Sequence, residues 1–561
     1  MARRAHAYPQ VMPVAADLVD GAVVAGPATL AASDAARLAR RRGAEVLAAG
    51  GGRWVLREDA ARAEALGVGA LPIGRLARPL PAVGARESEI VVRRHLSGGA
   101  PAVIVLRGRA PMGVVRRAPP PATLSMRARL ERALDADSRA LLATVGGLAA
   151  DHGGRAYAVG GLVRDAWLGR DGAGHDLDVV VEGDARMVAR SLAAARGGTL
   201  VEHERFLTAS VALPGGRRVD VVTARSERYE EPGALPRVMP ASIVQDLRRR
   251  DFTVNAMAVE LSSGSFGLLD PLGGAGDIAR RRLRVLHPLS FVEDPTRIVR
   301  AARYAARLSF GLDAWSARCR ALALEQAPYP ALSAARVGAE LERALAEDAA
   351  GGALHLLARA GAFRLLARGH RVTPAALLRL RALPATLAWA RAQAPVAPLE
   401  LLGAVLAADQ SEAVATATLR GVGLGGGPLG RVQAALAALP ALRESLTAAR
   451  RPSEAARAVR EAGPMAAAWL HAVADVATRA RLERLVAAEQ GARSQLGGEA
   501  VLDLGVRRGP EVATVLGALR DARLDGEIHE RQDEIDYVNA WLHKQSAGRR
   551  GPASPPDSRE G

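Results

Sequence analysis

The pattern of apolar and polar positions changes character along the chain. Residues 11–117 pass twice through the same order of apolar runs and helical stretches. The segments "EVLAAGGGRWVLRED" and "PAVIVLRGRAPMGVV" each have the pattern of a strand, a turn and a strand. The proline-rich "RRAPPPATLSM" then marks a boundary, and residues 126–154 have the spacing of one long amphipathic helix. The pattern predicts two similar α/β units followed by a separate domain.

The rest of the chain divides into a mixed part and a helical part. Residues 155–276 alternate strands such as "DLDVVVEG" and "RRVDVVTA" with helices such as "DARMVARSLAAARGG". From Asp277 to about Gln545, strand signals nearly vanish and Ala, Leu and Arg recur at helical spacing. The last residues, 546–561, have the composition of a disordered tail. The predicted fold class is α+β, with an α/β region, a small mixed sheet and an all-helical remainder.

Charge and cysteine content narrow the class of protein. Lys and Arg number 76 against 59 Asp and Glu, a net charge of +17 that indicates a polyanionic partner such as nucleic acid. Cys319 is the only cysteine, which excludes an internal disulfide and a cysteine-based metal site. The N-terminus lacks the apolar core of a signal peptide, and we find no uncharged apolar run of about 18 residues. A soluble, cytoplasmic protein without a membrane partner is expected.

Two carboxylates stand at the start of the apolar run "DLDVVV". Side chains alternate faces along a strand, so Asp176 and Asp178 point one way while Leu177 and Val179 point into the core. Paired carboxylates repel each other unless a cation lies between them, and Mg²⁺ prefers such hard oxygen ligands. Asp220 begins another apolar strand and is placed beside them. We therefore predict that these three aspartates are catalytic and hold two Mg²⁺ ions about 3.5 to 4 Å apart.

A glycine turn precedes the aspartates. In "YAVGGLVRDAWLG" a predicted strand ends in Gly160 and Gly161 and a helix follows, so bare backbone N–H groups can meet a triphosphate. The guanidinium of Arg164 would add a positive charge and two hydrogen-bond donors for the triphosphate. A lone DxD is more often a solvated strand end, and a lone GG pair often serves a tight turn. The two together, about ten residues apart, are much more specific.

Five blocks together carry a family resemblance. They are "GGLVRD" with "DLD", "ARSERYEEPGALPRV", "DLRRRDFTVNAMAVEL", "GLLDPLGGAGDIARRRLRVLHPLSFVEDPTRIVRAARYAARLSF" and "SAARVGAELERAL". In this order they resemble the class II tRNA nucleotidyltransferases and bacterial poly(A) polymerases of the DNA polymerase beta superfamily, over residues 155 to about 345. The resemblance implies that Asp176 and Asp178 hold the metals. It also implies that "RRDFTVNA" recognises ribose and phosphate, through Arg249 or Arg250, Asp251 and Asn255.

The resemblance also implies a domain order. It consists of a degenerate pair of CBS-like modules at 11–117, a linker and first head helix at 118–154, and a nucleotidyltransferase head at 155–276. A helical neck at 277–345, an RNA-binding body and tail at 346–545, and the disordered tail at 546–561 follow. The oligomeric state stays open, with a dimer through the CBS-like region as the arrangement to test.

The segment "EDPTRIVRAARYAAR" has the chemistry of base selection. Asp294, Arg297, Arg300 and Arg303 recur every third residue on a predicted helix, nearly on one face. An ionised Asp only accepts hydrogen bonds and an Arg only donates them. Cytosine and adenine offer an amino donor beside a ring acceptor, which suits an Asp/Arg pair, whereas uracil and guanine present the reverse order. The family uses the matching Asp and Arg as its template for base choice.

Two places depart from the family pattern. The last block has Ala335 before Arg336 where the family usually has Glu-Arg, which leaves a helix contact there in doubt. A nucleotide-binding CBS module typically has a ribose-binding Asp after its last strand, and here Arg116 and Arg117 stand instead. A structural or RNA-facing role is therefore favoured over adenylate sensing for this region.

These observations predict an RNA 3′-end nucleotidyltransferase that uses ATP and CTP with Mg²⁺ on tRNA or another RNA. Complete CCA addition, A-only addition beside a separate CC-adding enzyme, and poly(A) synthesis all stay open. Poly(A) synthesis is the least favoured of the three, because "HERFLTASVAL" stands where a "GRRF"-like stretch is expected. A different class, a non-catalytic RNA-binding or nucleotide-sensing protein, would be expected to have lost the metal ligands.

Overall fold

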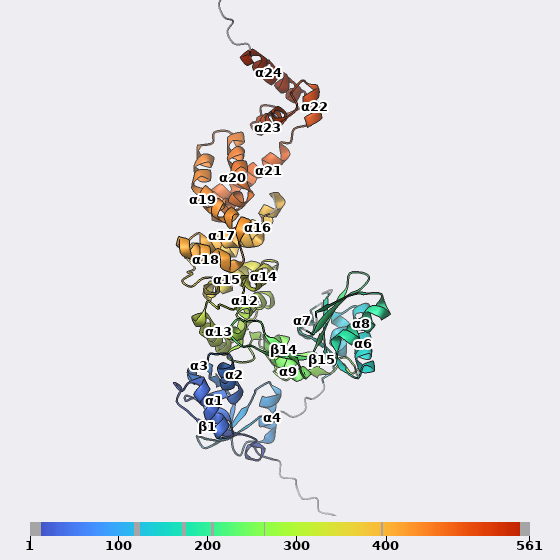
Figure 1. Ribbon diagram of the computed structural model, residues 1–561, viewed down its shortest axis with the longest axis vertical. Coiled ribbons are helices and arrows are strands. Elements are labelled where there is room, and N and C mark those ends of the chain that lie inside the picture. Colours follow the sequence, from blue (N-terminus) through green and yellow to red (C-terminus); the bar gives the residue numbers. More distant parts are fainter. Residues whose placement is uncertain are drawn as a thin grey trace, which may run out of the picture. The chain divides into compact units, whose positions relative to one another are not determined.

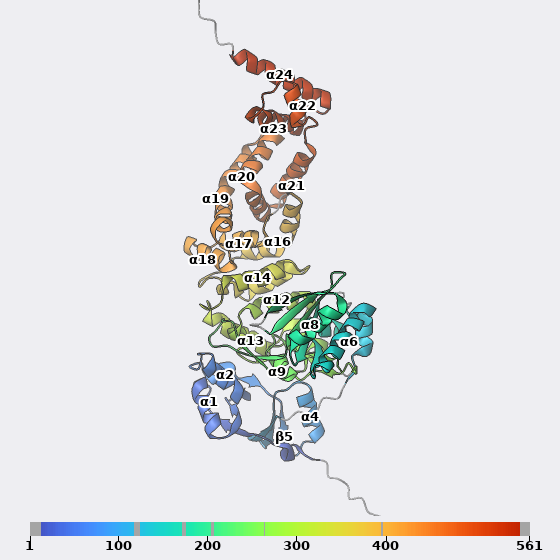
Figure 2. The same cartoon turned by 45° about the vertical axis from the view of Figure 1, so that its right-hand side comes forward.

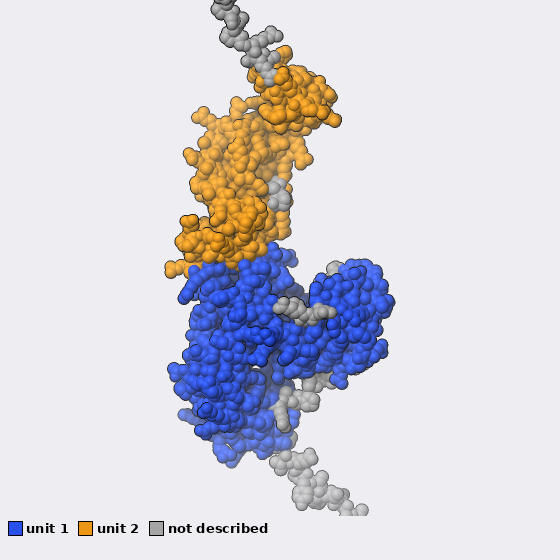
Figure 3. All heavy atoms as spheres, in the orientation of Figure 1, with its two compact units in different colours: residues 1–368 blue, residues 369–561 orange. Residues whose placement is uncertain are grey.

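The computed structural model describes residues 13–116, 124–170, 176–203, 207–262, 264–393 and 396–549. It divides into two compact units, residues 1–368 and 369–561, which Figure 3 colours separately. Most of the predicted proline-rich boundary and residues 550–561 of the predicted tail lie outside the described residues, whereas residues 546–549 of that tail belong to the last helix. Among the helices that are described, none has the length and apolar character needed to cross a membrane.

The N-terminal region contains the predicted repeat. In each of the two repeats, the first strand pairs parallel with the second, and the second pairs antiparallel with the third. The first unit comprises β1 (Ala22–Ala25), α1 (Ala32–Arg41), β2 (Ala44–Ala48) and β3 (Arg53–Leu56), and the second β5 (Ala82–Gly84), α4 (Glu89–Ser97), β6 (Val103–Arg107) and β7 (Ala110–Val115). Between them lie α2 (Arg57–Ala65), α3 (Ile73–Leu76) and β4 (Arg78–Pro79). The repeat is confirmed, whereas its CBS-like character stays a prediction.

The single long helix expected at 126–154 is wrong. The segment forms two helices, α5 (Arg127–Ala133) and α6 (Ala136–Asp151). The break falls at Leu134, which is extended, and at Asp135, whose carboxylate accepts a 2.7 Å hydrogen bond from the backbone N–H of Ser138. Asp135 is thus an N-cap, and a cap that satisfies a free N–H starts a new helix at this point.

A seven-stranded mixed sheet forms the centre of the head. Its order is β10 (Thr199–His203), β11 (Thr208–Ala212), β12 (Arg218–Thr223), β9 (Asp176–Glu182), β8 (Arg155–Val159), β15 (Ala258–Glu260) and β16 (Leu268–Leu269). The central strands β9 and β12 run parallel, and their other neighbours run antiparallel. Helices α6 and α8 (Ala185–Arg196) contact the sheet and lie side by side with it in Figures 1 and 2.

The other face of the sheet is covered only in part. Tyr157, Val159 and Val180 pack there against Ile243 and Leu247 of α9 (Ile243–Arg248). Asp178 lies on the same face of β9 as Val180, two residues earlier, and is exposed. The uncovered part of this face is where Asp178 and, in register with it on β12, Asp220 lie.

Helices follow the sheet and build the neck. They are α10 (Gly274–Ala279), α11 (Ser290–Glu293), α12 (Thr296–Leu308), α13 (Ala314–Gln326), α14 (Ala334–Leu345) and α15 (Ala350–Arg359). A hairpin of β13 (Arg225–Arg228) and β14 (Arg237–Pro240) precedes them, and α7 (Gly161–Leu168) connects β8 to β9. The paired two-residue strands β17 (Arg282–Leu283) and β18 (Gly311–Leu312) interrupt the helices.

The second unit is helical throughout its described residues. It comprises α16 (Pro374–Gln393), α17 (Pro398–Ala407), α18 (Glu412–Val422), α19 (Gly426–Ala448), α20 (Pro452–Val473), α21 (Val476–Gly491), α22 (Gly498–Asp503), α23 (Pro510–Leu524) and α24 (Arg531–Arg549). The fold is therefore α+β, as predicted.

Candidate active site

The carboxylates of Asp178 and Asp220 lie on neighbouring parallel strands in direct register. Leu177 and Val179 are buried, so alternation places Asp178 on the uncovered face. The Asp220 carboxylate accepts hydrogen bonds from the Ser210 hydroxyl and, at 2.9 Å, from Arg218 Nε. The predicted adjacency of the two aspartates is thus present in the structure.

Whether this edge suits a divalent metal depends on its donor set. Asp176 begins β9 and pairs with Arg218 in the strand register, but its side chain is outside the described atoms. The described residues contain no group of three or more metal-binding side chains. Asp178 and Asp220 do supply two hard carboxylates on one face of the sheet, and this donor type fits Mg²⁺.

The glycine turn lies beside Asp178. Gly160 adopts φ 69° and ψ −130° as the N-cap of α7, a conformation that favours glycine. A Cβ atom at this position would lie 3.4 Å from Arg250 Nη1 and 4.0 Å from Asp178 Oδ2. The turn therefore brings backbone close to both a carboxylate and a guanidinium.

Arg164 lies behind this turn rather than in the open site. Its side chain is 2% exposed. Nη1 donates to Asn255 Oδ1 at 2.6 Å, while Nε and Nη2 donate to Asp165 at 3.0 and 2.8 Å. The nucleotide-binding role predicted for Arg164 stays a prediction, and its contacts are those of a residue that holds Asn255.

Arg249 and Arg250 share one buried carboxylate. Asp246 of α9 has a fully buried side chain and accepts from Arg249 Nη2 at 2.8 Å and from Arg250 Nη2 at 2.9 Å. Burial acts to raise the pKa of Asp246, but the two guanidinium groups outweigh it and the pKa is lowered. Arg249 also donates to Glu227 of the hairpin at 2.6 Å. The pair is therefore fixed before any ligand binds.

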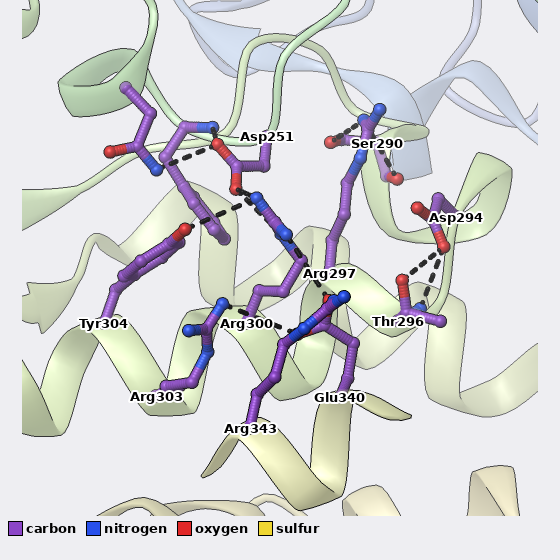
Figure 4. Close-up of polar contacts among 12 residues, drawn as sticks. Asp251, Ser290, Asp294, Thr296, Arg297, Arg300, Arg303, Tyr304, Glu340 and Arg343 are labelled. Carbon is purple, nitrogen blue, oxygen red and sulfur yellow. Dashed lines mark hydrogen bonds and ion pairs between the residues drawn. The ribbon is translucent and has the colours of Figure 1, made fainter. Parts of the chain in front are cut away.

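Asp251 connects the head to α12 of the neck. Its Oδ1 accepts from Asn255 Nδ2 at 3.0 Å, and its Oδ2 accepts from Arg300 Nε and Nη2 at 2.9 and 2.6 Å. Burial alone would raise the pKa of Asp251, but Arg300 and the Asn255 hydrogen bond lower it to about 2. Figure 4 shows this forked pair, which joins two predicted site residues.

Asp294 and Arg297 reach the same cavity but have different partners. Asp294 lies before α12 rather than on it, because the helix begins at Thr296. Its Oδ1 accepts from the Thr296 hydroxyl at 2.7 Å and from Arg336 Nη2 at 3.0 Å. Arg297 is buried and donates to Ser290 Oγ at 2.8 Å and to the carbonyl of Arg249 at 2.9 Å. Both side chains are held in place by neighbours (Figure 4).

Arg303 belongs to a second cluster, around Glu340 of α14. Glu340 is 5% exposed and contacts Arg343 at 2.6 Å, Arg300 at 3.4 Å and Arg303 at 3.5 Å. Arg303 also pairs with Glu347 at 3.1 Å and lies over the ring of Tyr304. This cluster closes the neck side of the site (Figure 4).

A cavity of about 560 Å³ joins these groups. Of the predicted residues, those lining it are Gly160, Gly161, Asp178, Arg249, Arg250, Asp251, Asn255, Asp294, Arg297 and Arg300. Asp220, Arg164 and Arg303 lie outside its lining, although each contacts or neighbours a residue that lines it. The structure thus gathers segments more than a hundred residues apart around one cavity.

Several lining residues were missed by sequence reasoning. Arg225, Glu227 and Tyr229 come from the block "ARSERYEEPGALPRV", whose residues carried no individual roles. Arg336 was noticed only as the neighbour of Ala335, and its guanidinium donates to Asp294 and to the Gly233 carbonyl. A charged or polar side chain inside a family block was the signal available for each of them.

Comparisons with known proteins agree with this arrangement. The poly(A) polymerase head domain matches residues 156–284. The A-adding tRNA nucleotidyltransferase of Geobacter sulfurreducens is 49% identical over 155 residues, which are 28% of this chain and 17% of that protein. The CC-adding tRNA nucleotidyltransferase of Deinococcus radiodurans is 49% identical over 151 residues, 27% of this chain and 40% of that protein. The chain thus spans less than half the length of these two relatives.

A solved structure extends the similarity beyond the head. The Thermotoga maritima CCA-adding enzyme complexed with tRNA has a TM-score of 0.61 and 27% identity, with 75% of this chain and 99% of that chain covered. The head-domain match at residues 156–284 falls within residues 155–345, where the five sequence blocks lie. Over its head the chain is thus similar to the poly(A) polymerase head domain and to tRNA nucleotidyltransferases, and over three quarters of its length it has the fold of a CCA-adding enzyme.

Proposed function

We propose that this protein adds CMP or AMP, or both, to the 3′ end of tRNA without a nucleic-acid template. The observation that carries the proposal is the cavity that connects Asp178, the glycine turn and the Asp294/Arg297 segment. The cavity reaches the Asp178 carboxylate, beside which a metal would bind, and it also contains hydrogen-bonding groups for a base, Asp294 and Arg297. A nucleoside triphosphate has a triphosphate that binds metal and a base that accepts and donates hydrogen bonds.

The carboxylate edge is assigned to the chemistry. Asp176, Asp178 and Asp220 would hold two Mg²⁺ ions, and nucleotidyltransferases generally use divalent metals. When bound, such ions favour attack of the RNA hydroxyl on the α-phosphate and stabilise departing pyrophosphate. The chain's own contribution is to orient the triphosphate, with the backbone at Gly160 and Gly161 and a guanidinium such as Arg250 beside it.

The neck end of the cavity is assigned to base choice. Asp294 accepts hydrogen bonds and Arg297 donates them, which suits the amino group and ring acceptor of cytosine or adenine. Thr296 and Arg336 hold the Asp294 carboxylate, and Ser290 holds the Arg297 guanidinium. Their fixed positions favour discrimination, because a wrong base would strand a buried polar group.

Besides CC-only addition, which is supported by 49% identity to the CC-adding enzyme of Deinococcus radiodurans, two versions of the reaction are open. Complete CCA addition is the first, and it is supported by similarity to the CCA-adding enzyme of Thermotoga maritima. A-only addition is the second, and it is supported by 49% identity to the A-adding enzyme of Geobacter sulfurreducens. Poly(A) synthesis stays the least favoured, and a non-catalytic role is disfavoured because Asp178 and Asp220 are retained. We assign RNA binding to residues 346–545 and place the protein in the cytoplasm, where tRNA is matured.

One incubation series tests the proposal. Purified full-length protein is mixed with Mg²⁺, one nucleoside triphosphate at a time, and tRNA ending in the discriminator base, in C or in CC. Extension of all three substrates by the appropriate CTP or ATP indicates CCA addition, and extension of the CC-ending tRNA alone by ATP indicates A-only addition. No extension of any substrate would refute the proposed activity.

A further inference from the structure

A guanidinium from the N-terminal region reaches the residue that directly precedes Asp294 of the candidate site. Arg62 of α2 donates from Nη1 to Glu293 Oε1 at 2.9 Å, across 231 positions of sequence. Glu293 is the last residue of α11 and is 4% exposed. Its other carboxylate oxygen lies 3.2 Å from Nε2 of His287, which is also buried. A residue outside the head and neck thus neutralises a buried carboxylate of the neck.

Glu293 directly precedes Asp294, the residue assigned to base choice. The carbonyl of Glu293 accepts a 3.2 Å hydrogen bond from the backbone N–H of Gly233. The carbonyl of Gly233 accepts from Arg336 Nη1 at 2.5 Å, and Arg336 Nη2 donates to Asp294 at 3.0 Å. A continuous set of contacts therefore runs from Arg62 to the Asp294 carboxylate.

The electrostatics of this contact depend on both partners. Burial would raise the pKa of Glu293, but His287, Arg62 and Arg297 outweigh it and hold the pKa well below its usual range. Burial likewise acts to lower the pKa of Arg62, and Glu293 outweighs it and raises the pKa. Removal of one partner from a buried pair leaves an uncompensated charge, so the loss of Arg62 would be felt at Glu293.

The N-terminal region is also packed closely against the neck and head. Arg78 pairs with Asp59 at 2.8 Å and lies over the ring of Trp315 of α13 at 4.3 Å. A Cβ atom at Gly99 would come within 2.2 Å of the Leu272 carbonyl, so this approach requires glycine. Such close packing can transmit the position of α2 to the segment that carries Asp294.

We propose that Arg62 is a positioning residue for nucleotide selection, through which the N-terminal region holds the Glu293–Asp294 segment in place. The inference rests on the proposed function, because it assigns base choice to Asp294. In this role the N-terminal region contributes to nucleotide specificity without binding a nucleotide itself. This role fits the N-terminal repeat, where Arg116 pairs with Glu45 at 2.7 Å and with Glu58 at 3.0 Å.

A matched pair of variants separates positioning from simple attachment. Arg75 of α3 also pairs with the neck, at Glu325 of α13, but this pair is exposed and involves no residue of the cavity. Arg62→Ala and Arg75→Ala each remove one guanidinium between the same two regions. Arg62→Lys retains the charge and serves as the conservative rescue.

The first readout is the incorporation of correct relative to incorrect nucleotides by full-length protein on tRNA lacking its 3′ end. We expect Arg62→Ala to lower this ratio about tenfold, within the range of coupling among contacting residues. Arg75→Ala should leave the ratio at the wild-type value, and Arg62→Lys should recover most of it. An unchanged ratio in folded Arg62→Ala would overturn the inference, as would an equal fall in Arg75→Ala.

The second readout is hydrogen exchange of the backbone amides of residues 290–297, which does not depend on activity. Arg62→Ala should speed their exchange relative to wild type, whereas Arg75→Ala should not. Unchanged exchange in Arg62→Ala would overturn the positioning role even in an active enzyme. A wild-type protein that incorporates no nucleotide would refute the proposed function and the effect on selectivity together, and exchange would then still decide whether Arg62 holds the segment.

Discussion

The carboxylate edge of the head, Asp178 and Asp220, differs in burial from the arginine-rich wall, which is Asp246 and Asp251 with the arginines that pair with them. At the edge, Asp178 is exposed on an uncovered face, and Asp220 beside it retains 28% of its side-chain exposure. In the wall, Asp246 is fully buried between two arginines, and Asp251 is buried against Arg300. The carboxylates of the edge are in contact with solvent, whereas the carboxylates of the wall are paired with arginines inside the fold.

This difference separates two kinds of function. An exposed carboxylate interacts largely through solvent, so its loss should affect chemistry far more than stability. A buried pair contributes to the fold itself, and breaking it should destabilise the protein along with the site. We expect the edge to be replaceable without loss of folding and the wall not to be.

Replacing Asp178 with Ala should produce the largest effect. We expect nucleotide incorporation to fall by at least about 10³-fold, since a metal supplies several kcal/mol of transition-state stabilisation. Melting temperature and tRNA affinity should stay near wild type, because the lost carboxylate is exposed. Asp151→Ala, an exposed aspartate at the end of α6, is the matched control and should retain full activity. Activity of Asp178→Ala within tenfold of wild type would refute the metal assignment.

Replacing Asp251 with Asn tests the wall, where we expect the substitution to reduce stability. The change leaves Arg300 with only its more distant carboxylate, Glu340 at 3.4 Å, and we expect a loss of about 3 kcal/mol in the free energy of unfolding. Denaturant titration at neutral pH measures it. If Asp251→Asn unfolds with the wild-type midpoint and slope, the pair does not stabilise the join between head and neck.

The pH dependence of that loss gives an independent check. The pKa of Asp251 is lowered from 3.8 to about 2, so its stabilisation is present above pH 3.8 and disappears as the pH falls toward 2. The stability difference between wild type and Asp251→Asn should therefore shrink by about 2 kcal/mol across this window. A difference that grows on acidification would contradict the ion pair.

Replacing Ser210 with Ala should have the smallest effect. The Ser210 hydroxyl donates to Asp220 at the edge, and loss of one such hydrogen bond is expected to cost about 0.5–1.5 kcal/mol, or roughly 2- to 10-fold in rate. Single-turnover incorporation at saturating Mg²⁺ measures it. A loss as large as that of Asp178→Ala would mean that Ser210 takes part in the chemistry itself.

Local patterns predicted the elements of the fold well. Alternation in "DLDVVV" placed β9 and the face of its aspartates, and the 3.6-residue periodicity identified the helical neck and second unit. The two-residue strands β17 and β18 were not predicted, because so short a pairing depends on contacts distant in sequence. The break at Asp135 was missed although an Asp three residues before a helical N–H is a capping signal.

The sequence predicted which residues belong to the site better than it predicted which residues they contact. The family blocks contain the residues that line the cavity, but only ten of these 21 were predicted individually, and the spacing of Asp294 and Arg297 suggested a shared role. Their actual partners, Arg336 for Asp294 and Ser290 for Arg297, come from other segments. Arg62 carried no signal, since its meaning arises only when α2 docks beside α11.

The measurement that tests the division between edge and wall most directly is the ratio of correct to incorrect nucleotide incorporation. CTP and ATP would be compared with UTP and GTP on tRNA lacking its 3′ end, for Asp178→Glu and Asp294→Ala. The first change should slow all nucleotides alike and leave the ratio intact. The second should lower the ratio by about 1–3 kcal/mol, or roughly 5- to 150-fold, while incorporation survives. An unchanged ratio in an active Asp294→Ala, or a changed ratio in Asp178→Glu, would contradict this account.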